Sequence, residues 1–248
     1  EIIMNVIILA AGFGSRLKEL TKEKGKALVE LKDKPLIDYA LRFTDNEKVE
    51  KRVIVGGYTF DKLMAHIDKS CPEKTVLLEN KQYDKGSILT LLTAKDYLTT
   101  DFLLMNVDHV YAPEMFDKIT KNISGITAVI DSARNIVEDD MKVKLDKNKR
   151  IVGIDKRLTD YDAGYIGMTL VSADSLPTYL SAVDAVLTIK GEGAVVEPIL
   201  QYLSEKGTAI NTVDIAGLPW CEMNTQEERE YALQMLDTHK DRFKKYFI

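Results

Sequence analysis

Short runs of β-branched residues alternate along the first half of the chain with longer stretches in which apolar residues recur at helical spacing. The apolar runs predict strands over residues 4–9, 52–55, 75–78, 102–107 and 126–130. The amphipathic stretches predict helices over residues 35–43, 60–68, 87–97 and 113–122. Strands that alternate with helices in this way indicate βαβ units and a mostly parallel sheet. Pro35 and Pro113 suit the first turns of their helices, because proline fixes φ and has no amide hydrogen to lose there.

The pattern changes after residue 130. Residues 141–145, 148–150 and 151–155 predict two strands joined by a polar turn, and hence an antiparallel hairpin. The remaining elements expected are a strand over 163–171, helices over 176–183 and 194–205, and a strand over 209–213. Residues 226–246 predict one charged amphipathic helix, and its inner face carries Tyr231, Leu233, Met235 and Leu236.

No repeat, low-complexity tract or linker divides the chain, so we expect one domain over residues 1–248. Its fold class is α/β: a Rossmann-like, mixed and mostly parallel sheet flanked by helices, with an inserted antiparallel hairpin. A first half of about residues 4–131 carries the alternating pattern, and a second half of about 132–248 carries the hairpin.

Composition narrows the classes of function. The 248 residues are 45% apolar and 29% charged with a net charge of −5, and no dense Lys/Arg cluster favours binding to duplex nucleic acid. Cys71 and Cys221 are far apart and lack a CxxC spacing, which argues against a disulfide framework or a zinc site. The apolar run over residues 4–11 is too short to span a membrane and lacks a basic region before it. We therefore expect a cytoplasmic protein without nucleic-acid or membrane partners.

A glycine-rich loop follows the first predicted strand, with the sequence LAAGFGSRL over residues 9–17. Its small residues let backbone N–H groups approach a ligand closely, and the guanidinium of Arg16 suits phosphate oxygens. The loop is not a P-loop, because no Gly-Lys-Ser/Thr closes it, and it lacks the third glycine of a dinucleotide fingerprint. An ordinary strand–helix turn with a surface arginine is the alternative. Lys26 follows a polar stretch and could anchor a loop that folds over a triphosphate.

Acidic and amide side chains supply a candidate metal site. Asp108 ends the strand predicted over 102–107, so it would face the same crevice as the glycine loop and offer a carboxylate to Mg²⁺. Glu222 and Asn224 alternate in an extended segment and would point to one side. The alternatives are a turn-capping aspartate, and a helix N-cap at Asn224 or Thr225.

The sequence leaves the roles of two further groups of residues undecided. Gly86 and Ser87 begin a predicted helix, where they would suit an anion or a base edge, or form a plain N-cap. Lys142 and Lys144 lie on one face of a predicted strand, where lysines also protect a solvated edge.

The runs LAAGFGSRL, KALVEL and KPLIDYAL resemble the N-terminal signature of the sugar-nucleotide pyrophosphorylase and cytidylyltransferase superfamily, which has the nucleotide-diphospho-sugar transferase fold. The run NVDHVY and the block over residues 142–167 resemble inositol-1-phosphate cytidylyltransferases. Two positions depart from the superfamily pattern. Gly25 replaces a proline, which would loosen the loop, and Asn224 replaces a second acid, which puts metal affinity or metal choice in doubt.

The resemblance implies a role for each candidate. The nucleotide is bound by Leu9, Ala10, Ala11, Gly12, Gly14, Ser15, Arg16, Lys26, Gly86 and Ser87. The metal is bound by Asp108, Glu222 and Asn224, and the acceptor by Lys142, Lys156, Asp162 and Tyr165. Arg16, Lys26 and Asp108 carry catalysis.

The implied reaction is Mg²⁺-dependent transfer of a nucleoside monophosphate, with CTP and inositol 1-phosphate as the first choice of substrates and pyrophosphate as the leaving group. Phosphocholine, 2-aminoethylphosphonate or a sugar 1-phosphate are alternative acceptors, and Tyr161 and Tyr165 keep a quaternary ammonium open. A nucleotide-binding regulatory module without turnover is the non-enzymatic alternative. A homodimer is compatible with the sequence.

Overall fold

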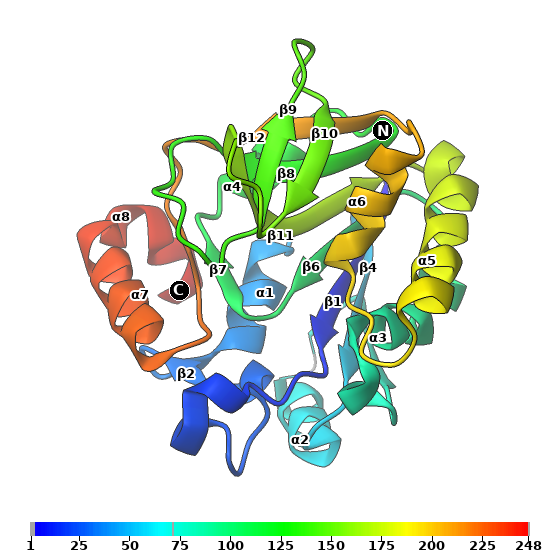
Figure 1. Ribbon diagram of the computed structural model, residues 1–248. Helices are drawn as coiled ribbons and strands as arrows, with labels where there is room; N and C mark the ends of the chain where they lie inside the picture. The colour runs from blue at the N-terminus through cyan, green and yellow to red at the C-terminus, as the bar shows by residue number, and fades with distance from the viewer. Residues whose placement is uncertain (1–2, 71, 248) are drawn as a thin grey trace.

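The computed structural model describes residues 3–70 and 72–247, so Cys71 lies outside the described residues. A central sheet of nine strands runs through the described part of the chain (Figure 1). Its strands are β1 (Met4–Ala10), β4 (Val49–Gly56), β5 (Thr75–Glu79), β6 (Phe102–Asn106), β8 (Ile126–Asp131), β9 (Lys142–Leu145), β10 (Ile151–Asp155), β11 (Ala163–Val171) and β12 (Ile210–Asp214). Two small ribbons accompany it, β2 (Glu30–Leu31) with β3 (Lys34–Pro35), and β7 (His109–Tyr111) with β13 (Trp220–Glu222).

The sheet is mixed, and its two halves follow the two sequence patterns. Strands β5, β4, β1 and β6 are parallel neighbours, which matches the alternation of strands and helices in the first half. Strand β11 is antiparallel to β6, β8 and β9, while β9 and β10 form the expected antiparallel hairpin and β12 is parallel to β8. The predicted fold class is therefore confirmed.

Helices cover both faces of the sheet, with α5 and α6 on one side and α7 and α8 on the other (Figure 1). The α-helices are α1 (Leu36–Phe43), α2 (Phe60–Ser70), α3 (Ser87–Thr93), α4 (Met115–Ile119), α5 (Leu176–Lys190), α6 (Glu197–Glu205), α7 (Gln226–Thr238) and α8 (Lys240–Phe243). Short 3₁₀ turns lie at Ser15–Leu20, Lys26–Leu28, Tyr83–Lys85, Lys95–Tyr97, Ala173–Ser175 and Lys244–Phe247.

Alternation along β1 shows how the core is divided. Val6 and Ile8 pack in a cluster with α1 and α7, whereas Ile7 and Leu9 pack in a second cluster with α3, α5 and α6. Every residue of β1 is buried, because a parallel strand covered by helices on both faces has no solvated side. The strand is thereby held rigidly, and the loop that follows it starts from a fixed point.

The boundaries of several predicted helices were wrong. Pro35 is the N-cap of α1 and Pro113 precedes α4, so neither lies inside a first turn. Helix α4 ends early, where the Thr120 hydroxyl donates to the Phe116 carbonyl. Helix α3 ends at Thr93 and continues only as a 3₁₀ turn. Helix α5 runs to Lys190, and Gly191, with φ of 68°, ends it.

Helix α6 begins at Glu197 rather than at Ala194. The preceding segment, residues 191–196, contains Gly191 and Gly193 with positive φ, which no regular helix accommodates. This segment instead pairs with the start of α3, where the amide of Ile88 donates to the carbonyl of Ala194 at 3.2 Å.

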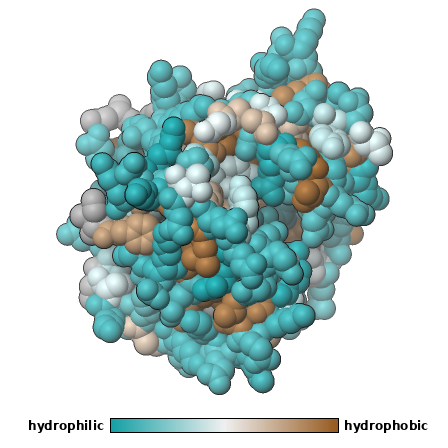
Figure 2. Space-filling model, turned by 90° about the vertical axis from the view of Figure 1, so that its left-hand side faces the viewer, coloured by the Kyte–Doolittle hydropathy of each residue, from teal (hydrophilic) through white to brown (hydrophobic). Residues whose placement is uncertain are grey.

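The predicted C-terminal helix is broken at His239 into α7, α8 and a 3₁₀ turn. The break lets Phe243 and Tyr246 turn back into the core, where they are almost fully buried. Met235 and Leu236 are buried as expected, but Tyr231 is 59% exposed and does not belong to the inner face. The face of the molecule in Figure 2 is mainly hydrophilic, and its apolar spots are scattered.

No helix in the described part of the chain is long and apolar enough to cross a membrane.

Candidate active site

The loops after β1 and β6 leave the sheet side by side. Leu9 pairs with Asn106 in the parallel register of these strands, and the amide of Val107 donates to the carbonyl of Leu9 at 3.1 Å. The glycine-rich loop and Asp108 therefore emerge at the same carboxyl edge, where open α/β sheets bind ligands. A cavity of about 420 Å³ opens there.

Most of the predicted nucleotide and metal residues line this cavity, which we call the nucleotide cavity. They are Leu9, Ala11, Gly12, Gly14, Ser15, Arg16, Lys26, Ser87, Asp108, Glu222 and Asn224. Ala10 and Gly86 do not line it. Ala10 packs into the core cluster below the loop, and Gly86 lies against the backbone of Ala194.

Lys26 is the centre of a polar cluster in this cavity. Its ammonium donates to the carboxylate of Asp108 and to the amide oxygen of Asn224 at 2.5 Å. The amide nitrogen of Asn224 in turn donates to the carboxylate of Glu222. The backbone amide of Lys26 donates to the carbonyl of Gly12 at 3.4 Å, which ties the lysine to the glycine-rich loop. Side chains from three distant parts of the sequence therefore share one hydrogen-bonded network.

His109, which was not among the residues predicted from the sequence, completes this network. Its Nδ1 lies 2.7 Å from Oδ1 of Asp108, and its Nε2 lies 3.9 Å from Oε2 of Glu222. The ring is buried and stacks on Trp220, with ring centroids 5.8 Å apart. The available signal was its position directly after Asp108, in the short strand β7.

Charge pairing decides the ionisation of these groups. Burial alone would raise the pKa of Asp108, but the charge of Lys26 and the hydrogen bond from His109 hold the pKa of this carboxyl well below its usual value. Burial alone would lower the pKa of His109, but the nearby carboxylates of Asp108 and Glu222 raise it. Asp108 is thus kept ionised, and an ionised carboxylate is what a hard cation needs.

The same cluster fits a divalent cation. Asp108, His109 and Glu222 each offer one ligand atom, and these atoms lie within 4.8 Å of one another. The pairing of β7 with β13 places Glu222 opposite His109. Two carboxylates with an amide oxygen suit Mg²⁺, whereas the imidazole is better suited to orient Asp108 through its hydrogen bond.

The sequence left open whether Asn224 binds a metal or caps the following helix; in the structure the cap is Thr225, and Asn224 belongs to the polar cluster. Thr225 is the N-cap of α7, and its hydroxyl accepts from the amide of Glu228 at 3.2 Å in a capping box. Asn224 directs its side chain into the cluster instead.

Gly25 does not loosen the loop before Lys26. Its amide donates to the hydroxyl of Thr59 at 2.7 Å, and a Cβ at this position would lie 2.8 Å from the carbonyl oxygen of Tyr58. A proline could neither donate this hydrogen bond nor fit so close to the backbone. The glycine therefore permits a close approach that fixes the loop.

A second cavity of about 580 Å³ adjoins the first, and we call it the acceptor cavity. The cavity takes this name from Lys156 and Tyr165, which line it and which the sequence predicts to bind the acceptor. The two cavities share a wall, which consists of Asn106, Lys156, Val195, Glu197 and Glu222.

Lys142 and Asp162 were wrongly assigned to the acceptor. The strand β9 lies between β10 and β11, so Lys142 is not on a solvated edge; it is buried, and its ammonium donates to the carbonyls of Glu138 and Lys156. Asp162 accepts from the amide of Leu145 at 2.8 Å and lies 3.5 Å from Lys144. Both residues stabilise the hairpin instead of lining either cavity.

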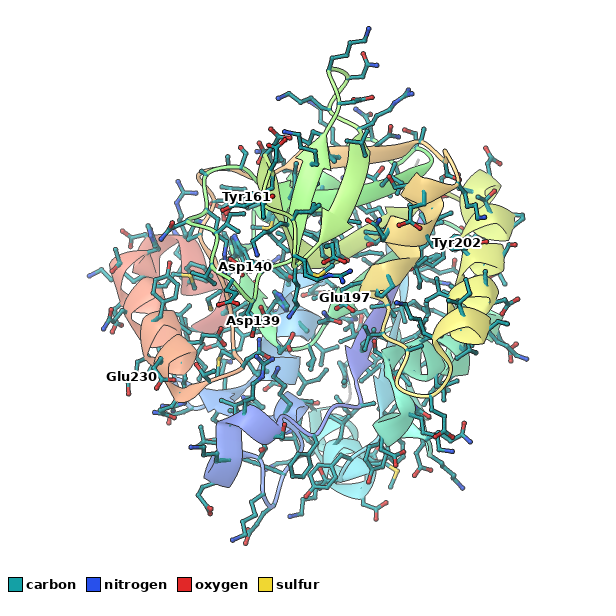
Figure 3. The ribbon with its side chains drawn as sticks, in the orientation of Figure 1. Asp139, Asp140, Tyr161, Glu197, Tyr202 and Glu230 are labelled. Carbon is teal, nitrogen blue, oxygen red and sulfur yellow. The ribbon has the colours of Figure 1, made fainter. Side chains whose placement is uncertain are left out.

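The segment before β9 brings a carboxylate into the lining of the acceptor cavity. Asp139 lies 3.1 Å from the guanidinium of Arg16 and 3.3 Å from the ammonium of Lys156. Figure 3 shows Asp139 on this segment and Glu197 at the start of α6, both toward the middle of the molecule. The hydrogen bond and charge of Lys156 lower the pKa of Asp139, and Arg16 contributes further. The Asp139 carboxylate thus forms salt bridges with two cationic side chains, Arg16 and Lys156, that could otherwise bind phosphate.

Comparison with known proteins places this site in a family. Residues 6–138 match the MobA-like NTP transferase domain. The chain is 30% identical to CTP:phosphoglutamine cytidylyltransferase from Campylobacter jejuni, over 93% of this chain and 100% of that protein.

Two solved structures have a similar fold. The inositol-1-phosphate CTP transferase from T. maritima has a TM-score of 0.81 at 19% identity, covering 97% of this chain and 98% of that one. The CTP:phosphocholine cytidylyltransferase from Streptococcus pneumoniae has a TM-score of 0.75 at 22% identity, covering 95% and 100%. At these identities the similarity shows the fold alone. By the domain match and the full-length relative, the chain belongs to the MobA-like NTP transferase family of the nucleotide-diphospho-sugar transferase superfamily, and it is a nucleotidyltransferase.

Proposed function

We propose that this enzyme transfers CMP from CTP to the phosphate of a small phosphorylated acceptor and releases pyrophosphate. The observation that carries the proposal is the shared wall of the two cavities. The cluster around Lys26 and Asp108 lies in the nucleotide cavity, and Lys156 faces both cavities. A nucleotide and an acceptor bound in these cavities would meet at the shared wall.

In this reaction an oxygen of the acceptor phosphate attacks the α-phosphorus of CTP. A new P–O bond forms, the bond between the α-phosphorus and the bridging oxygen breaks, and pyrophosphate leaves with that oxygen. The attacking oxygen is already anionic near neutral pH, so positioning and charge stabilisation suffice and no general base is needed.

Each charged residue has a proposed task. Lys26 and Arg16 bind the triphosphate, and Lys156 binds the acceptor phosphate. Asp108 and Glu222, with the amide oxygen of Asn224, would hold Mg²⁺, which supplies neutralisation of the phosphate charge when it is bound. His109 keeps the Asp108 carboxylate oriented through the 2.7 Å hydrogen bond.

CTP is favoured because it is the nucleotide named for the full-length relative and for both similar structures. Their named acceptors differ: phosphoglutamine, inositol 1-phosphate and phosphocholine. The block over residues 142–167 resembles inositol-1-phosphate cytidylyltransferases, but its Lys142 and Asp162 line neither cavity. Inositol 1-phosphate, phosphocholine, 2-aminoethylphosphonate and sugar 1-phosphates are therefore all candidate acceptors.

Pyrophosphate release tests the proposal. We would combine each of the four common ribonucleoside triphosphates with a panel of acceptors that includes all the compounds named above, with and without Mg²⁺. Release with CTP and at least one acceptor is expected, and its absence with every pair would overturn the proposed activity.

Two variants test the metal site. Asp108→Asn should abolish turnover while the protein stays folded. Asp160→Asn is the control and should leave turnover unchanged, because among the described contacts the Asp160 carboxylate pairs only with the surface residue Lys144. Unchanged turnover in Asp108→Asn would contradict the assignment.

A further inference from the structure

Glu197 presents a carboxylate to the wall shared by the two cavities. No side chain among residues 3–70 and 72–247 donates a hydrogen bond to this carboxylate or forms a salt bridge with it, and its one hydrogen bond comes from its own backbone amide. Burial raises the pKa of Glu197 and the nearby carboxylates of Asp108 and Glu222 raise it further, whereas its own backbone amide and the charge of Lys156 lower it. A negatively charged Glu197 carboxylate is unfavourable in such surroundings unless a cation binds to it.

The other carboxylates of the acceptor cavity are already paired. Asp140 lies 3.0 Å from Arg134, Asp155 lies 2.9 Å from Arg157, Asp139 contacts Arg16 and Lys156, and Glu222 accepts from Asn224. Glu197 is therefore the only carboxylate lining this cavity, within the described chain, that has neither a hydrogen bond nor a salt bridge from another side chain; the charge of Lys156 acts on it only from a longer distance.

The position of Glu197 is fixed by its neighbours. It is the first residue of α6, and Pro198 follows it. The hydroxyl of Ser87 accepts from the amide of Val196 at 3.1 Å, and Ile88 donates to Ala194. Ser87, predicted to contact the nucleotide, thus also holds the start of α6 against α3. A carboxylate on such a support can select a ligand group by position.

We propose that Glu197 binds a primary ammonium group of the acceptor while Lys156 binds its phosphate. This inference rests on the proposed function and narrows the substrate to phosphorylated compounds that also carry an ammonium group, such as amino-alcohol or amino-acid phosphates. An acceptor whose only other polar groups are hydroxyls, such as inositol 1-phosphate, displaces water from Glu197 without supplying a positive charge. An ammonium group supplies both the charge and the hydrogen-bond donors.

A primary ammonium fits better than a quaternary one. Quaternary groups are bound by open aromatic faces, but the guanidinium of Arg134 already lies 4.3 Å from the centre of the Trp220 ring. The unpaired group in the cavity wall is a carboxylate, which accepts hydrogen bonds that a primary ammonium can donate and a quaternary ammonium cannot.

Matched acceptors test the proposal. We would measure kcat/KM with CTP for phosphoethanolamine against 2-hydroxyethyl phosphate, and for 3-aminopropyl phosphate against 3-hydroxypropyl phosphate. Each pair differs only in an ammonium or a hydroxyl group. The wild type should prefer the ammonium acceptor by at least about tenfold at one of the two lengths, as a charge-assisted hydrogen bond predicts. Glu197→Gln should reduce that preference to about twofold or less. Glu205→Gln, an exposed position on the same helix, should retain it.

Binding by calorimetry, with a non-hydrolysable CTP analogue present, gives the same comparison without turnover. If the wild type binds and uses the ammonium and the hydroxyl member of each pair equally well, the inference is overturned. So would an equal loss for both members in Glu197→Gln, since that is the result of a purely structural role. If no pair releases pyrophosphate but the ammonium compound binds in a Glu197-dependent way, the proposed activity fails and the ammonium site stands. Turnover without any preference for the ammonium member supports the proposed activity and overturns the ammonium site.

Discussion

The ammonium of Lys26 is hydrogen-bonded to the carboxylate of Asp108, 82 positions further along the chain. Only 11% of the Lys26 side chain and 16% of the Asp108 side chain are exposed. Without ligands, each group neutralises the other. In the proposed reaction, Lys26 turns to the triphosphate and Asp108 to the metal, so the pair holds both side chains in place before the ligands bind.

Removing the Lys26 charge should therefore damage catalysis more than folding. We expect Lys26→Met to lower kcat/KM for CTP by roughly 10²–10³, because it removes a positive charge aimed at the reacting phosphates. Pyrophosphate release measures the loss. Lys24→Met, which removes a surface lysine paired with Glu30 at 3.2 Å, serves as the control. A loss of less than about tenfold would contradict the role assigned to Lys26.

Restoring the second acid should strengthen metal binding. We expect Asn224→Asp to lower the Mg²⁺ concentration for half-maximal activity by several-fold, because a charged ligand replaces a neutral amide oxygen next to Glu222. A Mg²⁺ titration of pyrophosphate release at fixed CTP measures this change. An unchanged Mg²⁺ requirement would show that Asn224 does not face the ion.

Asp139 should compete with both substrates. Its removal in Asp139→Asn frees Arg16 and Lys156, so the KM for CTP and for the acceptor should both fall. These ion pairs are exposed, and the effect should be about fivefold at most. Steady-state kinetics at low salt measure it, with Asp160→Asn as the control. A rise in either KM would mean that Asp139 contributes to binding rather than competing with it.

Gly86 should tolerate no side chain. Its φ is 97°, and a Cβ would lie 2.1 Å from the carbonyl oxygen of Ala194, so Gly86→Ala should destabilise the protein by roughly 3 kcal/mol or more. Gly191 also has a positive φ of 68° but no atom within 4 Å of such a Cβ, so Gly191→Ala should carry the backbone strain alone, about 1–2 kcal/mol. Urea denaturation compares the two. Equal losses would refute the close contact.

The contact between His66 and Asp38 should make stability depend on pH. The Nε2 of His66 lies 2.7 Å from Oδ1 of Asp38, and this hydrogen bond raises the pKa of His66 above its usual value of 6.5 although burial opposes it. Since the folded pKa is the higher one, the stabilisation is fully present below pH 6.5 and is lost as the pH rises through the folded pKa.

The free energy of unfolding of His66→Gln should therefore lie about 1 kcal/mol below that of the wild type in mildly acidic solution and approach it in alkaline solution. Urea denaturation of both proteins at several pH values tests this. A difference that does not change with pH would contradict the raised pKa.

The sequence by itself determined the strands of the first half, the glycine-rich loop, and the places of Lys26 and Asp108 at one edge of the sheet. Alternation and helical spacing are local consequences of burial, and a parallel sheet brings the carboxyl ends of its strands together. Those two rules sufficed for this part of the site.

Only the tertiary structure decided which side chains meet. Lys26 and Asn224 are 198 positions apart. The pairing of β7 with β13 brings the segment of Asn224 to Asp108, and the backbone hydrogen bond to Gly12 holds Lys26 there. Lys142 was misassigned because the periodicity of a strand does not tell whether its neighbour on each side is another strand or water. Glu197 had no motif to mark it. No side chain in the described residues forms a hydrogen bond or salt bridge with its carboxylate, and this can be recognised only when every neighbouring element has been placed.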